Sequence, residues 1–323
     1  MLKRVLLVLF FVTGVSSAQN SHATPDGVQR HWSFVTFGRI PVQSGGRIKP
    51  LDSFAREIVL YETGNRSYEG WNSIDLILSW IASPHYWDEK PFIRVGREDV
   101  RRQLGLDEKR VHFSPKELFQ NENLAQYANK LQEGGLDAQT TGLPGAPKAD
   151  PREQELKSVL DRVGLFHGIL TGEGWPLIPR PMPQAWSTLA APQQAVSQQA
   201  VSQQVGGQVG KNSHGEAIQR QFMEVLKAYV SGDAELFERS SLLLTHAVES
   251  EIPNYRENLK YPVVAETIYN RSRPFLMAWV LYLLAALSWM VCQIEGGPKS
   301  LQSVGRVGRM RKLALFLTSA AMF

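Results

Sequence analysis

An apolar run close to the start of the chain is flanked by basic and small residues. It covers residues 5–12, follows Lys3 and Arg4, and leads into small residues that end at Ala18. Basic, apolar and small residues in this order are typical of a secretory signal peptide. An uncut signal anchor is the alternative, but the run is too short to cross a hydrocarbon layer of ~30 Å as a helix. We therefore expect residues 1–18 to be a signal peptide that is cleaved after Ala18.

A second apolar run lies near the other end of the chain and contains no charged residue. It covers residues 274–294, and at ~1.5 Å per residue a helix of this length spans the core of a bilayer. A buried core helix is the alternative, but such helices usually carry a polar stripe, and this run is apolar on every face. Trp279, Tyr282 and Trp289 suit contacts at the lipid–water interface. The pattern predicts a transmembrane helix at residues 274–294.

The loop after this predicted helix is strongly basic. It covers residues 295–312 and carries Lys299, Arg306, Arg309, Arg311 and Lys312. Basic residues close to a span mark its cytoplasmic side. We therefore expect a cytoplasmic loop at residues 295–312 and an exported domain at residues 19–272 on the opposite face of the membrane.

The residues after this loop are again mostly apolar. They cover residues 313–323 and are too few to cross a membrane as a helix. We interpret them as the start of a second transmembrane helix, which implies that the sequence is part of a larger membrane protein. A natural apolar tail is the alternative.

The exported part begins with a strand pattern and continues with helical ones. Between residues 31 and 49, two runs of β-branched and aromatic residues are separated by Ser44-Gly45-Gly46, which predicts a β-hairpin. Pro50 then opens a helix that carries apolar residues at helical spacing and ends near Gly64.

Further along, a short strand is expected at residues 92–95. Ser114, Pro115 and Glu117 have the spacing of a capping box and predict a helix start. Other helices are expected at residues 72–82, 98–104, 121–132, 153–163, 215–230 and 233–248. The predicted fold class is therefore mainly α with a small β-hairpin near the N-terminus, an α+β domain.

Two segments of the exported part predict loops instead of packed elements. Residues 190–213 contain a five-residue period rich in Gln, Ser and Val, with too few bulky apolar side chains to fold alone. We expect a disordered linker loop there. Residues 134–150 are rich in Gly, Pro and Thr and predict another loop.

Composition limits the classes of function. With 323 residues, 43% of them hydrophobic, the chain can bury the core of one ordinary domain. The net charge of +4 does not indicate a nucleic-acid partner, because much of the excess lies in the signal and in the cytoplasmic loop. The single cysteine, Cys292, lies in the predicted span. The exported domain is therefore neither a thiol oxidoreductase nor itself a c-type cytochrome.

The titratable residues form no recognisable catalytic or metal-binding pattern. No two of the seven histidines stand at the i, i+4 spacing of a helical metal site. His31 beside Trp32 and His85 beside Tyr86 are candidates for the face of a haem, although aromatic residues also simply fill cores. The acidic residues have no identifiable partner base or nucleophile, so we predict no catalytic residue and leave open whether the chain is an enzyme.

One segment near the start of the exported domain resembles a known family. Residues 40–57 read Ile-Pro-Val-Gln-Ser-Gly-Gly-Arg-Ile-Lys-Pro-Leu-Asp-Ser-Phe-Ala-Arg-Glu. This hairpin–helix motif resembles P-V-x-x-G-G-R-x-K-P-L-D-T-x-A-R in the extracytoplasmic region of system II cytochrome c biogenesis proteins, the CcsA/ResC-like haem-handling family. Residues 266–275, which contain Tyr269 and Asn270, resemble the junction where that region enters the membrane.

The resemblance implies a role for the whole protein in cytochrome c maturation. It implies haem as the cofactor of the whole protein, a haem-lyase-type complex, and as partners another subunit of that complex and apocytochrome c. It places the protein in the bacterial cytoplasmic membrane with this domain on the periplasmic face. The family's tryptophan-rich haem-binding signature and membrane histidines belong to later helices, so no haem ligand carries over to this sequence.

The residue types of the motif indicate a structural role for several of its positions. Gly45 and Gly46 permit a tight turn, and Pro50 and Asp52 set the start of a helix.

The same motif contains a group of basic residues: Arg47, Lys49 and Arg56. They could meet haem propionates or an acidic partner, and salt bridges within the domain are the alternative. The leading hypothesis is a docking or scaffold domain, and the alternative is a membrane-tethered sensor domain.

Overall fold

The computed structural model describes residues 32–133, 150–181, 183–190, 213–272 and 274–295. The chain divides into two compact units, Met1–Val263 and Val264–Phe323, which are described separately. Five predicted segments lie wholly or almost wholly outside the described residues: the signal peptide, the loops at 134–150 and 190–213, the cytoplasmic loop at 295–312 and the start of a second transmembrane helix at 313–323.

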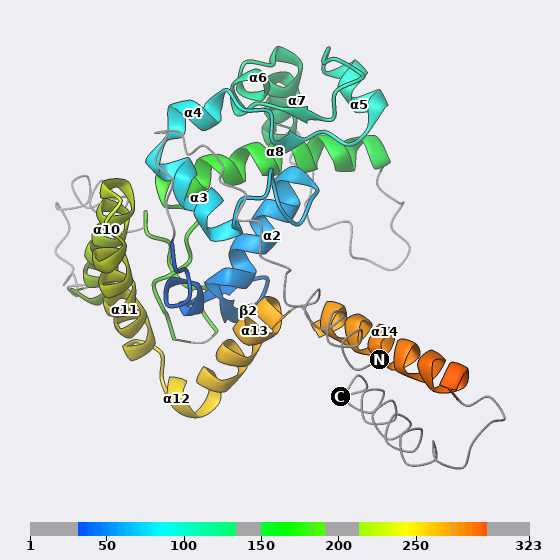
Figure 1. Cartoon of the computed structure of the whole chain (residues 1–323). Helices are drawn as coiled ribbons and strands as arrows, with labels where there is room; N and C mark the ends of the chain where they lie inside the picture. The colour runs from blue at the N-terminus through cyan, green and yellow to red at the C-terminus, as the bar shows by residue number, and fades with distance from the viewer. Residues whose placement is uncertain (1–31, 134–149, 182, 191–212, 273, 296–323) are drawn as a thin grey trace. The chain divides into compact units, whose positions relative to one another are not determined.

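Helices dominate the described residues, which confirms the prediction of a mainly α protein (Figure 1). In the first unit they are α2 (Leu51–Thr63), α3 (Ser73–Ala82), α4 (Pro84–Asp88), α5 (Glu98–Gln103), α6 (Pro115–Phe119), α7 (Glu122–Glu133), α8 (Pro151–Thr171), α10 (Ser213–Ser231), α11 (Ala234–Ser250) and α12 (Tyr255–Asn258), with a short 3₁₀ turn η1 (Phe37–Arg39). Helix α13 (Lys260–Ser272) crosses the boundary of the units, and α14 (Pro274–Glu295) belongs to the second.

Two small antiparallel sheets complete the first unit. Strands β1 (Pro41–Ser44) and β2 (Arg47–Pro50) form the predicted hairpin. Strands β3 (Ile93–Arg94) and β4 (His112–Phe113) form the other sheet. The strand expected at residues 92–95 is confirmed, but β4 was not predicted, because two residues are too few to show an alternating pattern.

Local signals place several helix ends where the sequence predicts them. The Asn72 side chain accepts a hydrogen bond of 2.9 Å from the backbone of Ile74 at the start of α3. At the start of α6, Ser114 and Glu117 form a complete capping box. Helix α2 ends at Gly64, whose φ of +72° is the left-handed conformation that favours glycine.

Other elements differ from the prediction. Helix α8 continues to Thr171, beyond the expected end at residue 163. Gly164 and Gly168 lower helix propensity there, but Gly168 also lets the backbone of Gly174 approach: a Cβ on Gly168 would lie 3.3 Å from the Gly174 nitrogen. Pro84 begins α4 instead of only ending α3, since proline is tolerated in the first turn of a helix.

The core of the first unit is rich in aromatic side chains. Trp80 of α3 is fully buried and stacks on Phe92, with ring centroids 5.2 Å apart. The ring of Phe166 on α8 packs edge to face with that of Trp80, with ring centroids 5.5 Å apart. Helix α8 also contacts α5, α6 and α7, so it links the middle of the chain to α3 (Figure 1).

Helix α14 exposes large apolar side chains on its surface. Phe275 is 81% exposed and Trp279 is 65% exposed. Among the described residues, no single helix is both long and apolar enough to cross a membrane. Helices α13 and α14, taken together up to Met290, have the required length and hydropathy, but they are bent by 49° relative to each other. The helix predicted at residues 274–294 is therefore confirmed as a helix, and its crossing of a membrane stays a prediction.

Candidate functional site

The hairpin–helix motif folds as one continuous piece made of β1, β2 and α2. Ser44 pairs with Arg47 at the end of the hairpin, so Gly45 and Gly46 form a two-residue turn. Their φ angles are +61° and +76°. Two central residues with positive φ fit the turn that best matches the twist of a hairpin, and only glycine takes this conformation at low cost. Pro50 then precedes the first residue of α2 in an extended conformation.

The basic side chains of the motif lie against carboxylates of α2. Lys49 is almost fully buried, and its Nζ lies 2.6 Å from Oε2 of Glu57. Arg47 lies 4.0 Å from the other carboxylate oxygen of Glu57, and both of these side chains are about half exposed. Arg56 donates a hydrogen bond of 2.9 Å to Asp52, four residues earlier on the same helix. The three cations therefore pair with two carboxylates of α2: Arg47 and Lys49 with Glu57, and Arg56 with Asp52.

Contacts from far along the chain hold the other side of the hairpin. The backbone N–H of Trp186 donates a hydrogen bond of 2.6 Å to the side-chain carbonyl of Gln43. The N–H of Gln43 in turn donates to the carbonyl of Pro176 over 3.4 Å. Phe54 of α2 packs on Trp175, with ring centroids 6.1 Å apart. The base of the motif is thus fixed in the core.

The tip of the motif is the part that faces solvent. Gly45, Gly46, Arg47 and Glu57 are exposed, whereas Lys49 and Asp52 are buried. We call the four exposed residues the hairpin tip. A turn with an adjacent cation and carboxylate can form hydrogen bonds and ion pairs with a partner.

The two candidate histidines are not brought together with the motif by any described contact. His31 lies outside the described residues, and its neighbour Trp32 packs on Tyr229 with ring centroids 5.3 Å apart. His85 is exposed on α4. Within the described ranges, no group of three or more His, Cys, Asp or Glu residues is arranged to hold a metal ion.

Tyr269 and Asn270, the candidates at the membrane junction, both lie near the end of α13 in the second unit. Tyr269 is 52% exposed and Asn270 is partly buried. The Tyr269 ring lies 6.5 Å from the ring of Phe275, the second residue of α14. The junction therefore presents aromatic surface to its surroundings.

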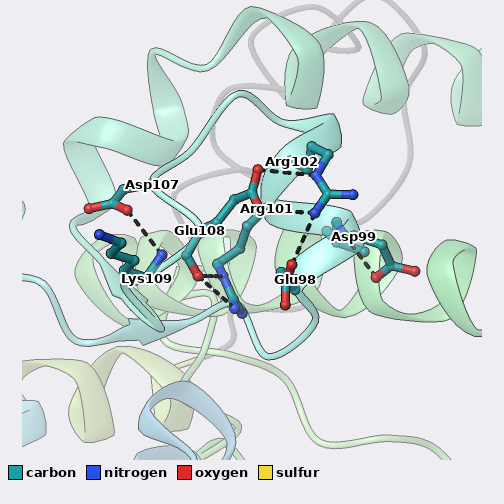
Figure 2. A network of polar contacts seen from close by, with 8 residues as sticks. Glu98, Asp99, Arg101, Arg102, Asp107, Glu108 and Lys109 are labelled. Carbon is teal, nitrogen blue, oxygen red and sulfur yellow. Dashed lines mark hydrogen bonds and ion pairs between the residues drawn. The ribbon is translucent and has the colours of Figure 1, made fainter.

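A second polar cluster surrounds α5 and was not predicted (Figure 2). Arg101 is buried, and its guanidinium donates hydrogen bonds of 2.9–3.1 Å to three backbone carbonyl oxygens, including that of Glu108. The neighbouring Arg102 is exposed and pairs with the carboxylates of Glu98 and Glu108. Arg101 therefore fixes the loop after α5, and the charges around it are largely balanced.

An open depression of about 420 Å³ lies beside this cluster. Its lining residues are Arg97, Glu98, Asp99 and Arg102. The hydrogen bond from Arg97 holds the pKa of the Asp99 carboxyl below its usual value. Because each arginine already pairs with a carboxylate, the depression offers little attraction to an anionic ligand.

A buried acid on α2 was also missed by sequence reasoning. Glu62 is completely buried, and neither of its carboxylate oxygens has a hydrogen-bond partner among the described residues. Burial raises the pKa of this carboxyl well above its usual value, and the nearby charge of Arg162 offsets part of the shift. Arg162 itself donates to the carbonyl oxygens of Tyr61 and Arg94 at 2.9 and 2.8 Å.

Some of these residues could be predicted from a local sequence pattern, and others could not. The Asp52–Arg56 pair has the i, i+4 spacing of a helical ion pair and could be found from the sequence. Glu57 lies within the motif, but its role as partner of Lys49 depends on how β2 meets α2. Glu62 and Arg162 are 100 positions apart, and no local pattern links them.

Comparison with known proteins gives one partial relative. No family model matches the chain. Protein NrfI of Wolinella succinogenes is 29% identical to it over 147 residues, which is 45% of this chain and 15% of NrfI. The match thus spans only a small part of the length of NrfI. The chain is similar to part of NrfI, and this similarity is distant.

Proposed function

We propose that the chain is the membrane-tethered, extracytoplasmic portion of a bacterial cytochrome c maturation protein. In this proposal the extracytoplasmic domain, expected at residues 19–272, acts as a docking or scaffold domain. The observation that carries it is the hairpin–helix motif, which resembles that of system II cytochrome c biogenesis proteins and folds as one continuous piece with an exposed tip. The partial similarity to NrfI is compatible with the same role.

The exposed apolar surface of α14 supports the membrane tether. Phe275, Trp279 and Trp289 are each more than half exposed. Apolar surface left in water costs ~25 cal/mol per Å², and a bilayer removes this cost. Together with the predicted signal peptide and basic loop, this tether supports our proposal that the first unit lies on the periplasmic face of the cytoplasmic membrane.

The exposure and the charge of the hairpin tip support docking there. The base of the hairpin is held to the core through Gln43, whereas Arg47 and Glu57 at its tip are exposed to a partner. We propose as partners another subunit of the maturation complex and apocytochrome c. Haem belongs in this proposal to the whole protein, and no described residue is assigned to it.

Covalent haem on c-type cytochromes tests the role of the whole protein. A strain that lacks the gene, grown under conditions that do not require c-type cytochromes, should show no haem-stained c-type cytochromes on denaturing gels. A plasmid copy of the full gene should restore them. Unchanged haem staining in the deletion strain would contradict the proposal and would favour a sensor.

A pair of charge reversals tests docking at the hairpin tip. Arg47→Glu should lower the amount of covalent haem several-fold while the protein accumulates normally by immunoblot. The matched control is Arg102→Glu, an exposed and ion-paired arginine of α5, which should leave haem attachment unchanged. Equal effects of the two variants would remove the tip from the proposal and leave the role of the whole protein standing.

A further inference from the structure

The junction between α13 and α14 exposes an apolar face on both helices. On α13, Ile268 and Tyr269 are 56% and 52% exposed. Together with Ala265 and Ser272 they have the spacing i, i+3, i+4, i+7, which places them on one face of the helix. On α14, Phe275 is 81% exposed. These large side chains therefore lie next to one another along the chain without a covering element in the described part of the second unit.

Contact between two rings joins the exposed faces of the two helices. The rings of Tyr269 and Phe275 meet edge to face, with centroids 6.5 Å apart and planes at 86°. The helices that carry them are bent by 49° relative to each other. The aromatic pair thus joins the two helices on either side of their break, and we call residues 268–272 and 274–279 the elbow.

The exposed surface of α13 also carries a cation. Arg271 is exposed and stands three residues after Ile268, so the two side chains are neighbours on the surface of α13. Tyrosine combines an apolar ring with a hydroxyl, and arginine binds phosphate through several N–H donors. Aromatic rings beside a cation are the combination that favours the headgroup region of a bilayer, where one end of a side chain is apolar and the other is hydrated.

We propose that the elbow binds the headgroup layer of the outer leaflet. In this arrangement Ile268, Tyr269 and Phe275 insert at the boundary between headgroups and acyl chains, and Arg271 contacts lipid phosphates. The occupant is lipid and not a second protein, because the elbow runs directly into the exposed apolar surface of α14. The inference rests on the membrane tether of the proposed function and adds that α13 lies against the membrane surface.

The depth of single spin labels tests this arrangement in the full chain. The native Cys292 is first replaced by serine, and single cysteines are introduced at Ile268, at Leu283 in the middle of α14, and at the exposed Lys227 of α10. The labelled chains are placed in vesicles of phosphatidylcholine and phosphatidylglycerol at a ratio of about 3:1. The apolar face of a helix that lies in the membrane interface is buried to a depth of ~5–10 Å in such a bilayer. Collisions with oxygen, which concentrates in lipid, and with a water-soluble nickel complex then report the position of each label.

The expected result is a graded series. The label at Leu283 should collide mainly with oxygen, the label at Lys227 mainly with nickel, and the label at Ile268 should give an intermediate ratio. A label at Ile268 that is as accessible to nickel as that at Lys227, while Leu283 remains in lipid, would overturn the inference and leave the tether intact. Protection of Ile268 from both reagents would also overturn it, in favour of a protein partner.

A hydrated label at Leu283 would have a different meaning. It would remove the membrane tether and, with it, both the proposed location of the protein and the inference about the elbow. The two failures are therefore distinguishable in one experiment. Tyr269→Cys, labelled in the same way, provides a second site on the same face of α13.

Discussion

Helices α3 and α14 are both strongly apolar in sequence, yet their surroundings are opposite. In α3, Ile74, Leu76 and Trp80 are at most 1% exposed, and α2, α8 and α10 contact the helix. In α14, Phe275 and Trp279 are 81% and 65% exposed. Apolar composition alone therefore does not tell whether a helix is buried in the protein core or leaves its apolar side chains exposed on the surface of the protein.

Length and helix ends separate the two cases better than composition does. With 10 residues, α3 is about 15 Å long, and it begins with a capping asparagine and ends before a proline. With 22 residues, α14 is about 33 Å long, close to the thickness of a hydrocarbon layer. The same residue type should accordingly have different energetic effects in the two helices.

The largest expected difference between the two helices is in the effect on stability of replacing a tryptophan. Trp80→Ala should lower the free energy of unfolding of the first unit by ~3–5 kcal/mol, because it removes a fully buried ring that contacts Phe92 and Phe166. Trp279→Ala should change it by less than about 0.5 kcal/mol. Urea unfolding of the full chain in mild detergent, followed by near-UV circular dichroism, measures both. Equal losses would break the comparison between the helices.

The next largest effect concerns insertion of α14 into a bilayer. Leu283→Arg should make insertion less favourable by ~2.5–3.5 kcal/mol, because it places a charge at the centre of the predicted span. The measurement is the fraction of the chain that stays with membranes after alkaline washing. Leu243→Arg is the matched control, since Leu243 of α11 is similarly exposed but lies in the first unit. Full retention of the Leu283→Arg chain would argue against a membrane-spanning α14.

The comparison between buried and exposed side chains also applies to two acids of α2, the buried Glu62 and the exposed Glu57. Replacing Glu62 should change the free energy of unfolding more than replacing Glu57. Since the pKa of Glu62 is raised in the folded state, the folded chain binds more protons than the unfolded chain once the pH exceeds the usual value of 4.5. Stability should therefore fall as the pH rises from 4.5 towards the folded-state pKa. Glu62→Gln should remove this part of the pH dependence and stabilise the chain at neutral pH.

Urea unfolding at pH 4.5 and pH 7.5 compares the two chains for this prediction, at the usual pKa of the acid and well above it. The difference between Glu62→Gln and the natural chain should be small at the lower pH and larger at the higher one. Identical pH dependence in the two chains would mean that Glu62 is solvated or paired in solution.

The smallest effect is expected for the exposed acid of the same helix. Glu57→Gln should cost about 0.5–1 kcal/mol, because the Glu57 carboxylate is about half exposed and water screens its attraction to Lys49. The cost should shrink further in high salt. Urea unfolding at low and high ionic strength measures it. A cost of several kcal/mol, insensitive to salt, would show that the buried ammonium of Lys49 dominates.

Local signals in the sequence predicted the elements that depend on neighbouring residues. The turn at Gly45 and Gly46, the capping box at Ser114 and the helix end at Gly64 all follow from backbone geometry within a few residues. These signals also located the hairpin–helix motif, with its turn and its helix start.

Contacts between distant segments could not be predicted in the same way. The bond between Trp186 and Gln43 joins residues 143 positions apart, and the bond between Tyr229 and the Asp75 carboxylate joins residues 154 positions apart. Whether Lys49 is buried, or Glu62 lacks a partner, depends on which helices pack against α2. A single sequence carries no direct signal for such packing.

The side of the membrane on which the first unit lies is the central claim, and one labelling experiment tests it. Lys227→Cys, in a chain whose native Cys292 is replaced by serine, is treated with a membrane-impermeant maleimide in cells with a permeabilised outer membrane and an intact cytoplasmic membrane. Because Lys227 is exposed on α10, the account predicts complete labelling before lysis. Labelling only after lysis of the cytoplasmic membrane would place the domain in the cytoplasm and contradict the account.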